Sequence, residues 1–292
     1  MAKSTSTTRG ARKAGKKRSG TARRERGLSL AAKADRHVCY QQSVQCVEAE
    51  IDFVDETFKD LRGRRLKQLR EDFGGTGNTS CEWVRRHTKA EAIVVDLDSD
   101  PLEWGREHNI GALKPGQRKR IKLVQADVRD VTTPKVDAVL AMNFSWMIFK
   151  HRDMLRTYFE RVRQSLVKDG VLFMDAYGGY ESFKEIRDKR TINKDLTYVW
   201  DQHRYDPITG EMDCFIHFHF RDGSKLNKAF EYSWRLWTLP ELREILDEAG
   251  FRRSTVYWEG TDEDTGEGNG EYEPAEHGDA DPAWVSYVVA EK

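Results

Sequence analysis

The stretch Glu71-Asp72-Phe73-Gly74-Gly75-Thr76-Gly77-Asn78 is the part of this 292-residue sequence that says most about the fold. It predicts a glycine-rich turn between a strand and a helix. Nineteen residues after Gly77, Asp96 ends the apolar run 92–95. Glycines let a backbone approach a ligand closely, and a carboxylate at the tip of the next strand can accept both hydroxyls of a ribose. We therefore expect a site for a ribose-bearing cofactor.

Short apolar strands and amphipathic helices alternate around this turn. Helices are predicted to begin near Asn78 and Pro101, and a third is predicted from Arg152 to Val167. Strands are predicted at residues 68–73, 92–96, 121–126, 136–142 and 170–176. This alternation is typical of an α/β fold with a doubly wound, mostly parallel sheet that binds cofactors at the carboxyl ends of its strands.

Beyond residue 176 the pattern predicts an inserted antiparallel β-meander over residues 196–237. Turn sequences at 206–210 and 222–224 separate its three expected strands. The capping box Thr238–Glu241 opens a further helix. The last two strands, 254–258 and 284–290, flank an acidic loop over residues 259–282.

The first 64 residues divide into two parts. Residues 1–36 carry twelve Lys or Arg against two acidic residues and lack apolar periodicity, which predicts a disordered basic tail. It is interpreted as a solvated tail, as an arm that contacts nucleic acid nonspecifically, or as a transit peptide. Residues 37–64 carry an apolar stripe from Val44 to Leu61, which predicts one helix packed on the core, with Tyr40 just upstream of the stripe reaching over the cofactor.

Composition excludes several classes of protein. The formal net charge is zero and 38% of the residues are hydrophobic, but no apolar run is long enough to span a bilayer, so we expect a soluble protein. The four cysteines form no CxxC pair, which indicates free thiols and a cytoplasmic location. His217 and His219 share a strand face and Cys214 lies on the other, so no metal site is expected.

The glycine-rich turn lacks part of a dinucleotide-binding fingerprint, because Ser80 stands where the third glycine belongs. Glu71 and Asp72 would repel a pyrophosphate, whereas they could take the positively charged amino group of an amino-acid cofactor. Asp127, at the tip of the third strand, could accept a hydrogen bond from an adenine amino group.

With these features residues 65–292 resemble the class I S-adenosylmethionine-dependent methyltransferases. The resemblance implies S-adenosylmethionine as cofactor and a seven-stranded sheet whose last strand is antiparallel. The strings Leu69–Phe73, Asn143–Trp146 and Trp234–Trp237 are similar to those of a bacterial subfamily of these enzymes. They indicate nothing about the methyl acceptor, so a small molecule, a protein and RNA stay open, as does the oligomeric state.

The resemblance also implies the cofactor-binding residues. Glu71 takes the acidic position of the first motif, and Phe73 stands in place of its first glycine. Asp96 is the ribose acid and Asp127 the adenine-side acid. The full set comprises Arg70, Glu71, Gly75, Gly77, Asp96, Leu97, Asp127, Val128, through its backbone amide, and Asn143.

Methyl transfer is an in-line displacement, so positioning supplies much of the rate. Asn143 follows the fourth strand and Trp146 lies three residues on, which is similar to the Asn-Pro-Pro-Tyr loop of amino-group methyltransferases and favours a nitrogen acceptor. Phe144 and Ser145 replace both prolines. Tyr177, after the fifth strand, is expected to orient the substrate. Asn143, Trp146 and Tyr177 are therefore the catalytic candidates. Each has an alternative structural role: Asn143 could cap the strand end, Trp146 could anchor the core, and Tyr177 could pack beneath the meander.

Other groups are candidates for a general base or for acceptor recognition. Asp175 and the two histidines His217 and His219 are candidate bases. The basic cluster Lys150–Arg152 could recognise an acidic acceptor. The leading hypothesis is a methyltransferase. An NAD(P)-dependent oxidoreductase and a non-catalytic protein that binds S-adenosylmethionine or nucleic acid are the alternatives.

Overall fold

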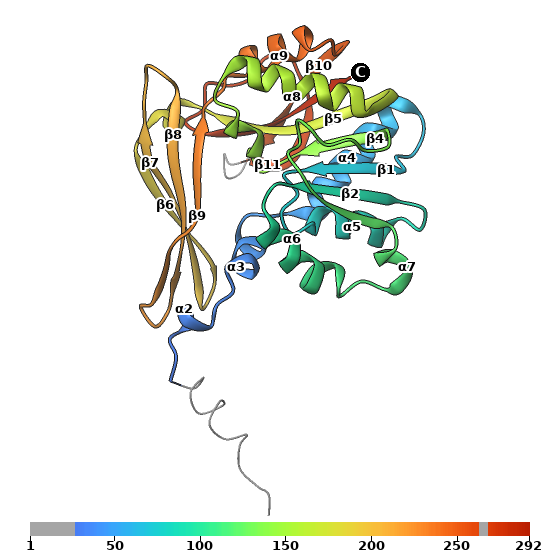
Figure 1. Ribbon diagram of the computed structural model, residues 1–292. Coiled ribbons are helices and arrows are strands. Elements are labelled where there is room, and N and C mark those ends of the chain that lie inside the picture. The colour runs from blue at the N-terminus through green and yellow to red at the C-terminus, as the bar shows by residue number, and fades with distance from the viewer. Residues whose placement is uncertain (1–26, 263–267) are drawn as a thin grey trace, which may run out of the picture.

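The computed structural model describes residues 27–262 and 268–292. They form an eight-stranded, mostly parallel sheet and a separate four-stranded antiparallel sheet (Figure 1). The strands of the first sheet lie in the order β11-β10-β12-β5-β4-β1-β2-β3. Their bounds are β1 Gln68–Asp72, β2 Glu91–Asp96, β3 Ile121–Gln125, β4 Val136–Ala141, β5 Leu166–Gly178, β10 Arg253–Thr261, β11 Gly268–Ala275 and β12 Trp284–Glu291.

The predicted α/β fold is confirmed, with one more strand than expected. Strands β3, β2, β1, β4 and β5 pair in parallel, and β12 runs antiparallel between β5 and β10. These are the seven strands of the prediction, including an antiparallel last strand. The eighth, β11, lies in the stretch predicted as an acidic loop and pairs with β10 at the sheet edge. Residues 263–267 of that loop lie outside the described residues.

Helices cover both faces of the large sheet, because neighbouring strand residues point to opposite sides. Val139 packs in the cluster that contains α8 and α9, whereas Leu140 packs in the cluster that contains α4 and α5. The α-helices are α2 Leu30–Lys33, α3 Arg36–Ser43, α4 Val47–Arg62, α5 Asn78–Arg86, α6 Ser99–Gly105, α7 Pro115–Arg118, α8 Arg152–Ser165 and α9 Leu239–Glu248. There are also a π-helix, η1 Arg106–Ile110, and two 3-10 helices, η2 Ser145–Ile148 and η3 Tyr180–Phe183.

The meander has four strands where three were predicted. It comprises β6 Ile186–Asn193, β7 Leu196–Tyr205, β8 Glu211–Phe220 and β9 Lys225–Arg235, paired in that order. The additional strand β6 is mostly exposed and lacks the apolar alternation that identifies a strand in a sequence. The meander stands beside the carboxyl edge of the large sheet (Figure 1).

Residues 37–64, predicted as one helix, form most of α3 and all of α4. The apolar stripe of α4 begins at Val47, and Val44 instead ends α3. Residues 27–36, which the sequence assigns to a basic tail, contain α2 and the start of α3, while residues 1–26 lie outside the described residues. No helix in the described part of the chain is both long and apolar enough to cross a membrane.

The segment α2–α3 is tied to both sheets. The backbone amides of Leu30 and Ala31 donate to Asp222 and Ser224 at the β8–β9 turn, at 2.8 and 3.0 Å. Further along, the Gln41 side chain donates to Thr76 of the glycine-rich turn at 3.0 Å. The segment therefore bridges the meander and the large sheet.

Beneath the glycine-rich turn lies a buried ion pair. The Arg70 guanidinium donates two hydrogen bonds of 2.8 Å to the Asp72 carboxylate, which also accepts from the Tyr158 hydroxyl at 3.0 Å. The Arg70 and Asp72 side chains are 1% and 0% exposed. Removing either partner would leave the other charge buried and uncompensated.

We predict that Arg70→Met lowers the free energy of unfolding by about 3–5 kcal/mol, because it leaves the Asp72 carboxylate buried in the core without its positively charged partner. Urea unfolding measures the change. Arg85→Met is the control: its 3.4 Å pair with Glu82 lies on the surface, so the expected loss is below about 0.5 kcal/mol. Equal midpoints for the two variants would contradict the structural role of Arg70.

Candidate functional site

The glycine-rich turn connects β1 to α5 through residues with left-handed backbone. Phe73, Gly75 and Gly77 have φ of 55°, 52° and 63°. A side chain at Gly74 would also collide with Val94, because an added Cβ would lie 2.5 Å from its Cγ1. The turn therefore depends on glycine at positions 74, 75 and 77, and it holds a phenylalanine, Phe73, in a left-handed conformation.

Phe73, where the related motif has glycine, is held by aromatic packing. Its ring centroid lies 5.6 Å from that of Tyr158 and 5.9 Å from that of Phe149. A left-handed residue other than glycine costs about 1–3 kcal/mol. Contacts between aromatic rings and the burial of the ring offset that cost. Phe73 thus anchors the turn to the α8 side of the sheet.

A cavity of about 480 Å³, called here the glycine-turn cavity, opens at this edge of the large sheet. Asp96, at the end of β2, lines it and accepts hydrogen bonds from the amides of Gly75 and Asp98 at 2.8 and 2.9 Å. Burial raises the pKa of the Asp96 carboxyl, and these hydrogen bonds partly oppose the shift. The cavity is lined by Arg36, His37, Tyr40, Gln45, 71–76, Asp96, Asp98, Pro101, Met142, Asn143, Ser145 and 228–232.

Helix α6 packs directly against the turn, a contact that the sequence did not indicate. At Gly105 an added Cβ would lie 2.2 Å from the Thr76 carbonyl oxygen, so only glycine allows the approach. The same carbonyl accepts from the Asn109 side chain at 3.0 Å. The wall of the cavity beside Thr76 is consequently fixed from two sides.

Glu71 lines the glycine-turn cavity and closes the first turn of α5. Its carboxylate accepts from the Ser80 amide at 3.0 Å and from the Ser80 hydroxyl at 2.5 Å. Burial raises the pKa of Glu71 to about 7, with the Ser80 hydrogen bonds opposing the shift. Nearby, burial raises the pKa of Glu50 to about 6, and this group accepts from the Thr79 hydroxyl at 3.2 Å.

Five other predicted cofactor contacts do not line this cavity in the structure, among them Gly77, the N-cap of α5. Arg70 is engaged with Asp72 below the turn. The Asp127 carboxylate accepts from the Arg129 guanidinium, with a shortest distance of 2.6 Å, and Val128 is buried in the core. Leu97 is 67% exposed beside Asp96. Direct contact from Asp127 to a ligand would have to compete with Arg129, and stays a prediction.

Asn143 and Phe144 form the turn that follows β4, with φ of 58° and 56°. Their amides both donate to the carboxylate of Asp175 on β5, at 2.6 and 2.8 Å. The left-handed turn is thus held by one buried side chain. Burial raises the pKa of Asp175 to about 7, against the effect of these two hydrogen bonds.

Trp146 differs from its predicted position. It is fully buried, and its indole nitrogen donates to the Asp175 carbonyl at 2.9 Å. The two left-handed residues before it turn the chain so that the ring enters the core. The prediction that Trp146 presents an aromatic face to an acceptor therefore disagrees with the structure, and its role is that of a core anchor.

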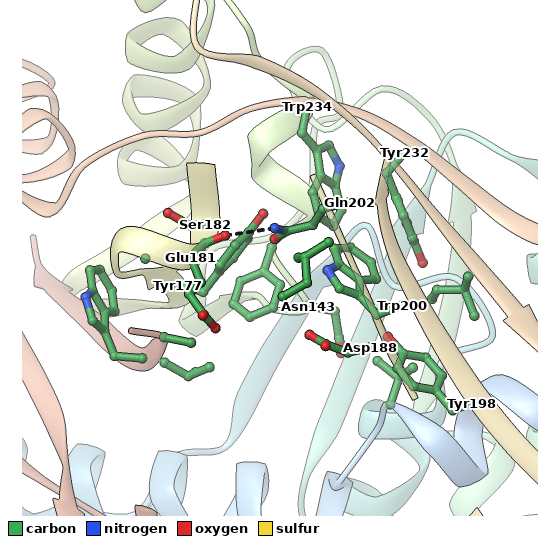
Figure 2. Close-up of a pocket in the computed structure, with 18 of the residues that line it drawn as sticks. Asn143, Tyr177, Glu181, Ser182, Asp188, Tyr198, Trp200, Gln202, Tyr232 and Trp234 are labelled. Atoms are coloured by element: carbon green, nitrogen blue, oxygen red, sulfur yellow. Dashed lines mark hydrogen bonds between the residues drawn. The ribbon is translucent and has the colours of Figure 1, made fainter. Parts of the chain in front are cut away.

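A second cavity, of about 390 Å³, lies between the large sheet and the meander (Figure 2). We call it the aromatic cavity. It shares Tyr40, Asn143 and Tyr232 with the glycine-turn cavity. Its other lining residues are Val44, Phe144, Tyr177, Gly178, Glu181, Ser182, Ile186, Asp188, Tyr198, Trp200, Gln202, Ile216, Trp234, Glu259, Ala283, Trp284 and Val285. The two cavities therefore meet at three residues, one of which is Asn143.

Aromatic rings and carboxylates dominate this second cavity. Eight of its lining residues are aromatic, three are Glu or Asp, and none of the described lining residues is Lys, Arg or His. The rings of Tyr232 and Trp234 have centroids 4.4 Å apart, and Trp200 lies 6.2 Å from each. Such a surface attracts cations and disfavours anions.

Tyr177 lines the aromatic cavity, and its role in orienting a substrate stays a prediction. Its ring packs edge-on against Phe144 at 4.8 Å, and its hydroxyl donates to the Met212 sulfur at 3.1 Å. Figure 2 shows Tyr177 near Glu181 and Ser182, with Trp200 and Tyr198 on the other side of the view. The contacts from η3, β6 and β7 were missed, although Tyr198, Trp200 and Gln202 alternate along a predicted strand.

The remaining sequence candidates lie elsewhere. His217 is buried away from the aromatic cavity, where it contacts Asp201 at 3.2 Å and accepts from the Lys228 amide at 3.1 Å. Its neighbour Ile216 points into the cavity, so His217 and His219 belong to the opposite face of β8. In the basic cluster, Lys150 pairs with Glu211 and Arg152 with Glu248. Within residues 27–262 and 268–292 no group of three or more His, Cys, Asp or Glu could hold a metal ion.

Solved structures with a similar fold include S-adenosylmethionine-dependent methyltransferases. One, from Clostridium acetobutylicum ATCC 824, is 16% identical with a TM-score of 0.64, over 87% of this chain and 96% of that one. CalS10, an amino pentose methyltransferase from Micromonospora echinaspora, is 15% identical with a TM-score of 0.62, over 90% and 98%. The sugar N-methyltransferase KedS8 from Streptoalloteichus sp ATCC 53650 is 16% identical with a TM-score of 0.60, over 100% and 98%.

No protein-family model matches the sequence, and no curated protein does. At this level of identity the structural likeness shows the fold, which is that of the class I methyltransferases.

The raised pKa values of the buried acids predict how stability varies with pH. Asp175 and Glu71 titrate near 7 in the folded protein, whereas unfolded carboxyls titrate near 4. The folded state therefore holds protons that the unfolded chain releases, and these groups lower stability as the pH rises from about 4 to about 7.

We expect Asp175→Asn to flatten this dependence, because the amide cannot ionise. Urea midpoints between pH 5 and 8 measure it. Asp153→Asn, on the exposed first turn of α8, is the control and should keep the wild-type slope. A slope unchanged by Asp175→Asn would show that Asp175 ionises in the folded protein as it does in the unfolded one.

Proposed function

We propose that this protein transfers a methyl group from S-adenosylmethionine to the nitrogen of an amine. The observation that carries the proposal is the junction of two cavities at Asn143, Tyr40 and Tyr232. One cavity has the glycine-rich turn and strand-tip acid suited to a nucleoside. The other is aromatic and acidic, which suits a cationic acceptor.

The glycine-turn cavity fits S-adenosylmethionine. Its volume of about 480 Å³ is within the usual range for small-molecule sites. At Gly75, added side-chain atoms would meet open space, so the backbone is accessible beside Asp96. Asp96 would hold the ribose hydroxyls, Glu71 would face the amino group, and the exposed Leu97 is available to cover an adenine face.

The geometry of Glu71 disfavours the oxidoreductase alternative. A dinucleotide places its pyrophosphate on the first amides of the helix after the glycine turn. Here the Ser80 amide of α5 is already engaged by the Glu71 carboxylate. A pyrophosphate would thus meet a buried carboxyl group instead of a free amide.

When bound, S-adenosylmethionine supplies an electrophilic methyl group attached to a sulfonium. The chain's contribution is to align the acceptor nitrogen with that methyl group at the junction of the cavities. Asn143 can accept or donate there through its side-chain amide, and Tyr40 and Tyr232 exclude water. Carboxylates in the aromatic cavity draw in the protonated amine, which must lose its proton before its lone pair can attack.

The proposed reaction needs no disulfide chemistry and suits a reducing compartment. All four cysteines are free, and three are buried. Free thiols are typical of the cytoplasm, where we place the activity.

We expect Asp96→Ala to weaken S-adenosylmethionine binding by at least about tenfold, because it removes the acceptor for the ribose hydroxyls. Calorimetric titration measures it. Asp130→Ala, which changes a carboxylate outside the lining of either cavity, is the control. Wild-type affinity in Asp96→Ala would refute the ribose assignment.

We expect Asn143→Ala to lower turnover by about ten- to hundredfold and to weaken cofactor binding much less, because the residue acts mainly at the junction. Labelled S-adenosylmethionine and a fractionated cell extract provide the assay. Label should enter a small basic compound retained on a cation exchanger. Label found only in RNA or in protein would contradict the proposed small amine, and unchanged turnover would remove Asn143 from the site.

A further inference from the structure

A third cavity adjoins the aromatic cavity and shares no lining residue with the glycine-turn cavity. It has a volume of about 300 Å³ and we call it the outer apolar cavity. Its wall is formed by side chains such as Phe183, Leu239, Pro240 and Trp258. Four residues, Tyr177, Gly178, Ser182 and Trp284, line both this cavity and the aromatic one.

The boundary between the two cavities is a short, well-fixed turn. The Ser182 hydroxyl donates to the Gly179 carbonyl at 2.6 Å, and the Glu181 amide donates to the Pro282 carbonyl at 2.8 Å. At Gly178 an added Cβ would lie 2.2 Å from the Trp284 ring, so the indole occupies the space of a side chain. The absence of a side chain at Gly178 therefore lets Trp284 form a wall of both cavities.

The chemistry of the outer apolar cavity differs from that of its neighbour. Aromatic and aliphatic surface dominates its lining, with the Trp258 and Trp284 rings 5.0 Å apart. Phe183 lines the cavity and is 49% exposed, so its ring is accessible to a ligand. Asp279 is the one charged residue among the described lining residues.

Resting on the proposed amine methylation, we propose that the acceptor is an amphipathic amine whose apolar or aromatic arm occupies the outer apolar cavity. Its amino group would enter the aromatic cavity past Glu181 and Tyr177, and the arm would remain between Phe183 and Trp258. Together the cavities have the size of a typical small-molecule site.

The same lining disfavours acceptors that carry phosphate. A nucleotide-linked or RNA acceptor would meet Glu181, Asp188, Glu259 and Asp279 across the two cavities, and no described lining residue supplies a compensating Lys, Arg or His. Phosphate recognition normally uses such cations. The inference therefore separates small amphipathic amines from the nucleic-acid acceptors that the sequence left open.

Matched probes test the proposal by calorimetry in the presence of S-adenosylhomocysteine. Butylamine carries only the amine, phenylbutylamine adds an aromatic arm, and phenylbutanol carries the arm without the amine. We expect phenylbutylamine to bind at least about tenfold more tightly than butylamine, since it buries a phenyl group. A para-carboxylate on the ring should remove that gain.

Variants locate the effect. Phe183→Ala, on a half-exposed turn, and Trp258→Ala should each reduce the advantage of phenylbutylamine by at least about threefold while leaving butylamine affinity unchanged. Ile208→Ala, which is 93% exposed on the β7–β8 turn, is the control and should change nothing. Two variants are used so that, if circular dichroism detects a folding defect in one, the other still tests the proposal.

The outcomes distinguish the two proposals. Equal affinity for butylamine and phenylbutylamine, or equal losses for both in the variants, would overturn the arm-binding role while leaving amine methylation intact. Binding of phenylbutanol but of neither amine would support the apolar subsite and refute the amine acceptor. Binding of none of the three probes would overturn both proposals.

Discussion

The hydrogen bonds that two consecutive backbone amides donate to the Asp175 carboxylate hold together the centre of the candidate site. These hydrogen bonds stabilise the left-handed backbone of Asn143 and Phe144, whose own preference for that conformation does not offset its free-energy cost. The position of Asn143 at the junction of the cavities, the contact of Phe144 with Tyr177 and the burial of Trp146 all follow from this one interaction. A carboxylate at the end of β5 thus shapes the end of β4.

Much of the large sheet could be predicted from the sequence, because its strands are apolar and its turns have recognisable residues. The position of Asp96 followed from the strand that precedes it. Strands β6 and β11 could not be found this way: β6 is mostly exposed and charged, and β11 contains two glycines. Both are edge strands, each paired on one side only, β6 with β7 and β11 with β10.

The position of a candidate side chain could be predicted where its residue lies at the end of a strand, and less well where a turn separates it from the strand. Asn143 follows β4 as expected, whereas Tyr177, expected just after the fifth strand, lies within the last two residues of β5. Trp146 comes three residues later, after two left-handed residues that reverse the chain, so spacing alone gave the wrong direction for its ring. The break between α3 and α4 likewise depends on a distant contact, the hydrogen bond from Arg190 of β6 to the Ser43 carbonyl.

The bridge made by α2 and α3 has a consequence for how the molecule comes apart. Because Leu30 and Ala31 are bonded to the meander and Gln41 to the glycine-rich turn, this segment links the two sheets in addition to their direct contacts, such as that of Tyr177 with Met212. Opening the cofactor site and loosening the meander should then occur together, as a single cooperative unit. The backbone amides of the meander and those of the glycine-rich turn should therefore gain or lose protection from hydrogen exchange together.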